Sequence, residues 1–538
     1  MDVAPVVFGR GSRGERYSEG LTTAPVLRVR SYRLGLELPI THERMTARLR
    51  MLVLGLLAAL AVVAAGCGGA TKSGSSGAGA SLVRPDALVF VSFDSDLGSS
   101  QWKQVDALSK KFPDRDMALA GIKKELAKHD VDYKRDVEPA LGSEVDVAIV
   151  PSPNLTDVAV VGLVKPDDAG KFKALVRKLN ESDDSGEPAV YREVNGWYAL
   201  SDSQAHIDQV LKSGDKSLAD ESVYNDALGK LPSEALVKAY VNGPQFGKLV
   251  QQLEQGKGNG LAASTPGLTK LDFISAALSA EDDGLRLHGA TAGKGSSSLT
   301  SGDYESKLVG GVPADALAFL TFKGGKGIDE LKHQLETNPT YSQVLPQIER
   351  ALGVKVADLL DLVRGEVALY VRPGGALPEV SLLLGTPAQA SGLKTLDLLA
   401  DRLRSYMHVK ATSTREDGRD VRTLDFGRFV VKYAGVGDKI MITSGLNGIG
   451  AYTASGSKLR DSADFKEAKS AAGLPSSNAG FIYVDLKNAI ALGESLAGLA
   501  GSSLPPEVGD NLRPLRSFVA WGENSGNAAT FDAFLEIK

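Results

Sequence analysis

The chain has 538 residues, a formal net charge of −5 at pH 7 and a single cysteine. Residues 1–66 hold nine Arg and five acidic residues, so residues 67–538 carry about −9 (−5 minus +4), which argues against nucleic acid or an anionic membrane surface as the main partner. One cysteine excludes an intramolecular disulfide framework, and a chain of this length is expected to form two to four domains.

Residues 1–44 differ from the rest of the chain. They contain seven Arg, no Lys and no sustained hydrophobic periodicity. Because a signal peptide functions at the amino terminus, we interpret Met45 as the natural start and residues 1–44 as translated upstream sequence. An extended positively charged region in front of a signal peptide is the alternative interpretation.

The stretch 45–66 has the parts of a secretory signal. Arg48 and Arg50 precede an uncharged apolar run, Met51 to Ala65. This run lies within the range of signal peptides and is shorter than the ~20 residues of a spanning helix. We therefore predict that residues 45–66 are a signal peptide. An uncleaved signal anchor is an alternative.

Small residues and the cysteine close the apolar run. Ala64, Ala65 and Gly66 stand directly before Cys67, whose thiol could carry a diacylglyceryl group. The stretch resembles the lipobox of bacterial lipoproteins, although Ala64 occupies the position where Leu is usual. We predict cleavage between Gly66 and Cys67, lipid attachment at Cys67, and a place on the extracytoplasmic face of a bacterial membrane. The alternative is an ordinary signal peptide followed by an unrelated cysteine.

Residues 67–81 are predicted to form a tether. The sequence GGATKSGSSGAGAS after Cys67 is too rich in Gly and Ser to bury a core. A Gly/Ser chain of this length spans about 20 Å on average, so the folded body would lie close to the membrane.

The remaining chain repeats its own pattern in the same order. Two copies of a module of about 220 residues are therefore predicted, at 82–293 and 304–538, with a Gly/Ser-rich linker at 294–303. The matching segments are 85–93 with 313–322, 142–148 with 365–370, 158–162 with 380–385, and 217–242 with 458–485.

Each module alternates short strands with a few helices. Strands are predicted at 88–93, 145–150, 158–164, 198–201 and 439–444, and closing hairpins at 275–288 and 518–536. A helix is predicted at 165–179, where Pro166 suits the first turn, and another after Thr386, with a stripe from Leu393 to Leu403. The fold class is therefore α+β: mostly antiparallel sheets with helices on one face of each.

This order of elements resembles a known family. The segments PDALVFVSF, the helix around Trp102, DVEPALG at 136–142, the helix 164–179 and SLADESVYNDALGKLP at 217–232 are similar to the uncharacterised bacterial family called domain of unknown function 3352. The resemblance covers the body from about Leu82 to the end. It implies a secreted or membrane-anchored protein and assigns no activity or catalytic residue.

The sequence motifs that would indicate a phosphate-binding, metal-binding or catalytic site are weak. Gly445 to Gly450 has the spacing GxxGxG rather than GxGxxG and is better interpreted as a glycine-rich helix start. No two histidines of residues 67–538 lie three or four positions apart, which argues against a zinc site. The stretch Asp94 to Gly98 hints at a calcium loop, but Asp96 or Ser99 capping the Trp102 helix is the simpler interpretation. We predict no cofactor, no metal and no catalytic residue.

Three classes of function remain. The first is a non-enzymatic lipoprotein that binds another envelope protein, which should expose an apolar patch. The second is a carrier or sensor of an apolar, lipid-like ligand, which should contain an apolar pocket. The third is a hydrolase, which should show ionisable groups with perturbed pKa values in a cleft.

Overall fold

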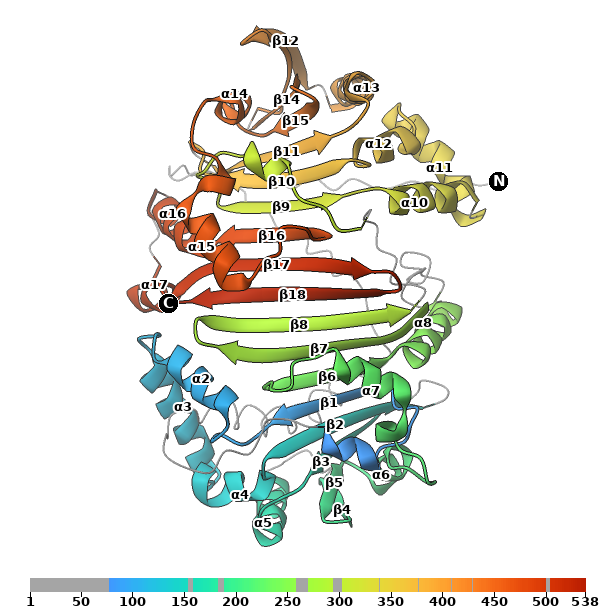
Figure 1. The fold of residues 1–538 in the computed structure, drawn as a ribbon, viewed down its shortest axis with the longest axis vertical. Helices are drawn as coiled ribbons and strands as arrows, with labels where there is room; N and C mark the ends of the chain where they lie inside the picture. The colour runs from blue at the N-terminus through green and yellow to red at the C-terminus, as the bar shows by residue number, and fades with distance from the viewer. Residues whose placement is uncertain are drawn as a thin grey trace, which may run out of the picture.

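The computed structural model describes residues 77–152, 158–181, 188–257, 270–293, 302–337, 339–375, 377–407, 409–427, 429–499 and 504–538. In this part of the chain, all eighteen strands belong to one sheet, and every pairing between them is antiparallel (Figure 1). The strands are β1 (Val89–Asp94), β2 (Glu144–Pro151), β3 (Val158–Val164), β4 (Val190–Val194), β5 (Trp197–Ser201), β6 (Val237–Asn242), β7 (Leu271–Glu281), β8 (Gly284–Gly293), β9 (Ala318–Lys323), β10 (Glu366–Arg372), β11 (Glu379–Gly385), β12 (Lys410–Glu416), β13 (Arg419–Asp425), β14 (Val430–Val436), β15 (Lys439–Thr443), β16 (Gly480–Asp485), β17 (Leu515–Ser525) and β18 (Ala528–Ile537).

The strand order is the same in both halves of the sheet. The first half runs β4–β5–β3–β2–β1–β6–β7–β8, and the second runs β14–β15–β11–β10–β9–β16–β17–β18, with β13 and β12 added beyond β14. The two halves meet where β8 pairs with β18 over nine residue pairs. One continuous sheet therefore replaces the separate sheets expected from the sequence.

Fifteen α-helices and several shorter helical turns accompany the sheet in the described residues. The α-helices are α2 (Ser100–Ser109), α3 (Arg115–Lys128), α4 (Glu138–Leu141), α5 (Ala169–Glu181), α6 (Gln204–Val210), α7 (Ser222–Gly229), α8 (Gly243–Lys257), α10 (Lys326–Thr337), α11 (Pro339–Leu352), α12 (Val356–Leu362), α13 (Gln389–Met407), α14 (Gly448–Thr453), α15 (Ala463–Ala472), α16 (Leu486–Leu499) and α17 (Pro506–Leu512). None of the described helices is both long and apolar enough to cross a bilayer.

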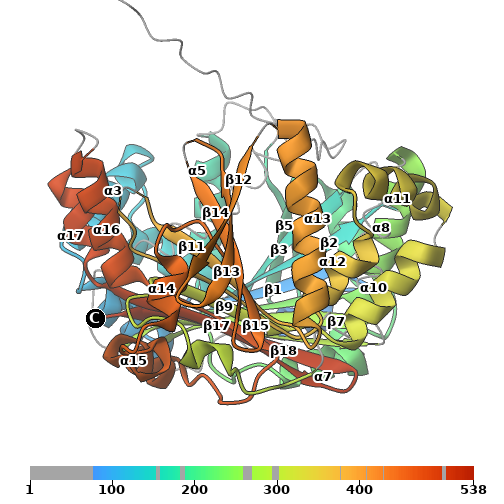
Figure 2. The same cartoon turned by 90° about the horizontal axis from the view of Figure 1, so that it is seen from above.

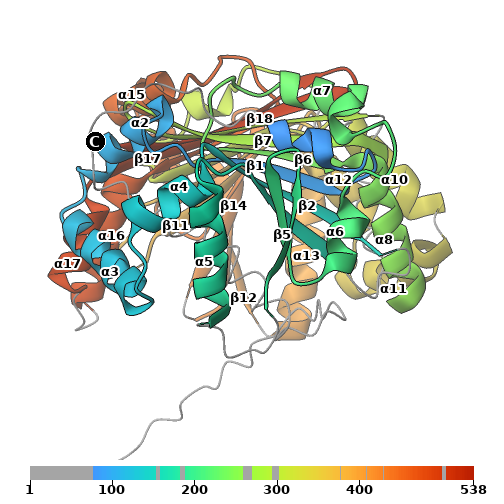
Figure 3. The same ribbon diagram turned by 90° about the horizontal axis from the view of Figure 1, so that it is seen from below.

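Helices cover both faces of the sheet, which corrects the prediction of helices on one face. The sheet is curved, with α7 and α15 on its convex face and α5, α8, α13 and α16 on its concave face (Figures 2 and 3). The physical reason is that many strands are apolar at successive positions, so both of their faces need a partner. The alternating residues of β1 show this, because Phe90 is buried on one face and Val91 is partly buried on the other.

The convex face carries the main cores. Its largest buried side chains include Tyr240 in the first half and Phe319, Tyr370 and Tyr483 in the second. In the first half, α7 and the 3-10 helix η1 (Ala78–Leu82) pack against them, and in the second half α15 does so. On the concave face, by contrast, α2, α5, α12 and α13 cover only parts of the sheet.

The predicted tether is shorter than the sequence suggested. Ala78–Leu82 form η1, in which Gly79, Ala80 and Leu82 are buried, so the last residues of the segment 67–81 belong to the folded body. Small residues allow this turn to lie directly on the sheet. The predicted signal peptide, residues 1–44 and most of the linker 294–303 lie outside the described residues.

Candidate functional site

Twelve adjacent strands, from β2 to β15, carry an unbroken row of apolar side chains across the concave face. Each member is the direct cross-strand partner of the next, and we call the row the apolar ladder. It consists of Val145, Phe93, Val237, Leu278, Leu287, Ala533, Ala520, Ile482, Leu320, Leu369, Leu382 and Ile442. Because neighbouring strands lie about 4.8 Å apart, the ladder extends over roughly 50 Å.

A second row runs parallel to the ladder, two residues away along each strand. It also lacks any polar side chain: Val147, Val91, Ala239, Ala276, Gly289, Phe531, Gly522, Gly480, Phe322, Val367, Leu384 and Ile440. Where the two halves meet, the ring of Phe531 lies directly over Gly289, because a Cβ on Gly289 would approach two ring atoms at 2.0 and 2.1 Å. Because glycine has no Cβ, position 289 leaves the space that the Phe531 ring occupies.

Part of this surface is exposed. Six large hydrophobic residues of the described strands are exposed, and five of them lie on the concave face. These five are Leu287, Leu369, Val380, Ile482 and Phe531, each 36–42% exposed. The sixth, Tyr191, is on the edge strand β4. A contiguous exposed apolar surface of this kind marks an interaction or ligand-binding site.

Helices form walls along the concave face. Figure 2 shows α3, α16 and α17 on one long side and α8, α10 and α11 on the other. At the two ends stand α5 and, opposite it, α13 with β12 (Figures 2 and 3). Some of these helices cover the outer parts of the two rows: α12 and α13 pack near Val367 and Ile440, and α2 packs near Val237. The exposed part is therefore the middle of the sheet.

The convex face holds a pair of buried carboxylates at the start of β2. Glu144 accepts hydrogen bonds from the backbone N–H groups of Gly77 (3.2 Å) and Ala78 (2.8 Å), and Asp146 accepts one from Gly79 (2.9 Å). Burial, followed by the neighbouring charge of Glu144, raises the pKa of Asp146 well above its usual range. The pair binds the first described turn of the chain, so we interpret it as structural.

A third carboxylate lies at the end of β1. Burial raises the pKa of Asp94 to about 6, although the hydroxyl of Ser99 donates a hydrogen bond to it at 2.6 Å. Ser99 also caps α2 by accepting from the backbone N–H of Trp102. This stretch therefore forms the cap of α2 rather than a calcium loop, which agrees with the simpler of the two interpretations of the sequence.

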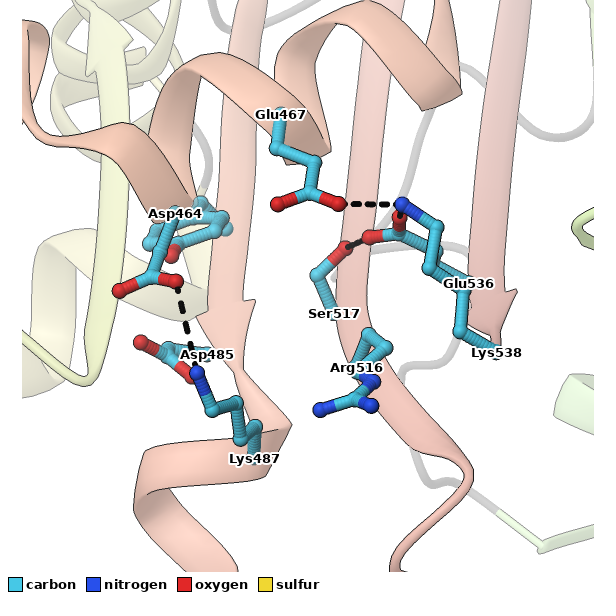
Figure 4. Close-up of a pocket in the computed structure, with 9 residues that line it drawn as sticks. Asp464, Glu467, Asp485, Lys487, Arg516, Ser517, Glu536 and Lys538 are labelled. Atoms are coloured by element: carbon cyan, nitrogen blue, oxygen red, sulfur yellow. Dashed lines mark hydrogen bonds and ion pairs between the residues drawn. The ribbon is translucent and has the colours of Figure 1, made fainter.

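A small charged cavity of about 140 Å³ lies at the end of β16–β18 beneath α15 (Figure 4). Lys538 pairs with Glu467 and, at 2.7 Å, with Glu536, which also accepts a hydrogen bond from Ser517 at 2.6 Å. Lys487 lies 3.9 Å from Asp464. Pairing with Lys538 lowers the pKa of Glu467, so the charged form of this carboxylate is stabilised.

The structure describes only some of the residues that the sequence singled out. Gly66 and Cys67, the predicted cleavage and lipid-attachment residues, lie outside the described residues. Gly448–Thr453 form a short helix, as expected for a glycine-rich helix start. Among the described residues, no group of three or more His, Cys, Asp and Glu side chains could hold a metal ion. The two apolar rows were missed, because apolar strands were interpreted simply as core.

Comparisons with known proteins give one finding. A family model described as a protein of unknown function, DUF3352, matches residues 49–537. The match includes the whole apolar run and Cys67, and it leaves out residues 1–48. No curated protein and no solved structure matches the chain.

Proposed function

Because the chain belongs to the DUF3352 family, whose description gives no activity, we propose a function from the concave face. The protein is a non-enzymatic, membrane-anchored binding protein of the bacterial cell envelope, and it binds the acyl chains of lipids on the apolar ladder. The observation that carries this proposal is the pair of unbroken apolar rows with an exposed middle.

The chemistry of the two rows favours hydrocarbon over a protein partner. A typical protein interface carries about one hydrogen bond per 100–200 Å². The two rows offer no polar side chain across twelve strands. The backbone of each of these strands is also hydrogen-bonded to a neighbouring strand on both edges. An acyl chain needs no hydrogen bond, and each CH₂ that leaves water contributes about 0.8 kcal/mol.

A charged substitution on the ladder tests this proposal. We expect Ile482→Asp to weaken the binding of pyrene-labelled palmitate by about tenfold or more, because a carboxylate in contact with hydrocarbon loses hydration. Ile482 is 38% exposed, so the substituted side chain stays solvated in the free protein. The measurement is a fluorescence titration of the full chain, combined with native mass spectrometry of lipids that copurify.

The matched control is Val223→Asp. Val223 is 39% exposed, close to Ile482, but it belongs to α7 on the convex face. We expect this variant to bind the probe like the unmodified chain. Equal affinity for all three proteins, or a copurifying protein in place of lipid on the unmodified chain, would contradict the proposal.

The membrane anchor is a separate part of the proposal. We propose that Cys67 carries a diacylglyceryl group, which supplies the two hydrocarbon chains that stable attachment requires. Cys67→Ser should move the protein from the membrane pellet to the soluble fraction, whereas Thr71→Ser in the same stretch should leave it in the pellet. A Cys67→Ser protein that still pellets and resists mild salt would overturn this assignment.

We further infer that the two halves are copies of one module. Their strand orders agree, and their first turns are held in the same way. Glu366 accepts hydrogen bonds from the backbone N–H groups of Lys307 (3.1 Å) and Leu308 (3.2 Å), as Glu144 does from Gly77 and Ala78. The ladder would then combine one apolar face from each copy.

A further inference from the structure

The charged cavity beneath α15 is built on a row of three polar residues at the ends of neighbouring strands. Asp485 of β16 is the direct partner of Ser517 in β17, which is in turn the partner of Glu536 in β18, and all three are buried. In the first half of the sheet, β6, β7 and β8 carry in the corresponding row Asn242, Phe273 and Ala292. Phe273 belongs to the hydrophobic core there. The fold itself therefore does not require charged side chains at this place, and burying them is costly.

A β-bulge adds an arginine to this cavity. The register of β17 against β18 shifts between Leu515 and Ser517, so Arg516 is an extra residue of β17 without a partner in β18. Neighbouring side chains of a regular strand point to opposite faces of the sheet, but Arg516 and Ser517 both line the cavity. The bulge thus turns the arginine toward the cavity. The first half has a register shift at the same place in β7, where the extra residue is Asp272, which is exposed.

Arg516 lacks an acidic partner among the described residues. Both lysines of the cavity, Lys487 and Lys538, lie within 3.9 Å of a carboxylate. Arg516 forms no such pair within the described part of the chain, and its buried Nε has no hydrogen-bond partner there. In Figure 4 its guanidinium group lies between the two lysines. A buried N–H group without an acceptor is unfavourable, and the partner that fits a guanidinium best is a carboxylate or phosphate, which accepts two parallel hydrogen bonds.

The charge and the size of the cavity indicate the kind of ligand. Its lining has four carboxylates and three basic side chains, so it is negative overall. A phosphate or another simple anion would be repelled by this excess, whereas a molecule that carries both a carboxylate and an ammonium group adds no net charge. The volume of about 140 Å³ corresponds to about five water molecules at ~30 Å³ each. This is the size of the smallest amino acids.

We propose that this cavity binds a small zwitterion of the amino-acid class, with the carboxylate of the ligand on Arg516 and its ammonium group toward Asp464 and Asp485. These two acidic side chains lie together on one side of the cavity, and Lys538 lies on the other (Figure 4). The site is on the convex face, beneath α15, and is separate from the apolar ladder.

Titration calorimetry of the full chain with three small ligands tests this inference. Glycine carries both charged groups, acetate lacks the ammonium group, and glycine methyl ester lacks the carboxylate. We expect glycine to bind and the other two ligands to bind at least about tenfold more weakly, because each loses one charged contact. Arg516→Gln should weaken glycine binding by about tenfold or more. The matched control is Arg513→Gln, because Arg513 is 77% exposed and pairs with Asp510 at 2.8 Å; this variant should bind glycine like the unmodified chain.

The other outcomes would overturn this inference. A chain that binds none of the three ligands has no such site. Acetate that binds as tightly as glycine would show a site for anions rather than for zwitterions. Glycine binding that is unchanged in Arg516→Gln would remove Arg516 as the partner of the carboxylate. The comparison of the three ligands uses the unmodified chain, so it decides between these outcomes independently of how well the variants fold.

Discussion

At the scale of single residues, the start of the folded body depends on glycine. The N–H groups of Gly77, Ala78 and Gly79 point at two buried carboxylates. A Cβ on Gly79 would lie 2.3 Å from a carboxylate oxygen of Asp146, which is itself fully buried. Close approach of the backbone is the reason for glycine at position 79, whereas Gly77 adopts a left-handed φ of 69°. The Gly/Ser composition that suggested a flexible tether therefore has a structural use in its last residues.

We expect Gly79→Ala to lower the free energy of unfolding by about 2 kcal/mol, because the turn must shift and leave a buried carboxylate short of a donor. Urea denaturation of the full chain measures this loss. Gly121→Ala is the matched control, since Gly121 lies within α3 and nothing stands within 4 Å of its added Cβ. Alanine there should stabilise the helix by about 0.5–1 kcal/mol. Equal and small effects of the two substitutions would contradict the role assigned to Gly79.

At the scale of elements, local pattern predicted much of the fold. The strand β3 was predicted with both of its ends, and the stripe from Leu393 to Leu403 lies within α13. The helix expected from Lys165 begins instead at Ala169, because the carboxylate of Asp168 accepts from the backbone N–H groups of Gly170 (2.7 Å) and Lys171 (3.1 Å). The predicted first turn is thus the capping segment of the helix.

The sequence could not reveal the pairing of β8 with β18 or the exposed face that depends on it. His288 and Asp532 are partners separated by 244 positions, and no local pattern indicates such a contact. Successive apolar residues, as in β3 and β6, predict a strand with two apolar faces but do not say whether a helix covers the second face. For this reason Leu287, Ile482 and Leu369 could not be distinguished from core residues before the strands were placed.

At the scale of the whole molecule, the β8–β18 pairing makes the two halves one sheet and the ladder one surface. Side chains reinforce this junction from both strands. Nδ1 of His288 lies 2.9 Å from a carboxylate oxygen of Asp532, and its Nε2 lies 3.2 Å from the carbonyl oxygen of Lys230. Both ring nitrogens therefore face acceptors, and the hydrogen bond to Asp532 outweighs partial burial and raises the pKa of His288.

A raised histidine pKa gives the junction a definite pH dependence. The imidazolium is favoured in the folded state, so its contribution is complete below the unfolded pKa of about 6.5 and is lost as pH rises through the higher folded value. We expect Asp532→Asn to lower the free energy of unfolding by about 1 kcal/mol more at about pH 5.5 than at about pH 9, measured by urea denaturation. Asp208→Asn is the control, because Asp208 pairs with Arg192, whose charge is constant over this range. Its effect should be the same at both pH values. A loss for Asp532→Asn that is equally independent of pH would mean that the carboxylate holds the junction without the charge of His288.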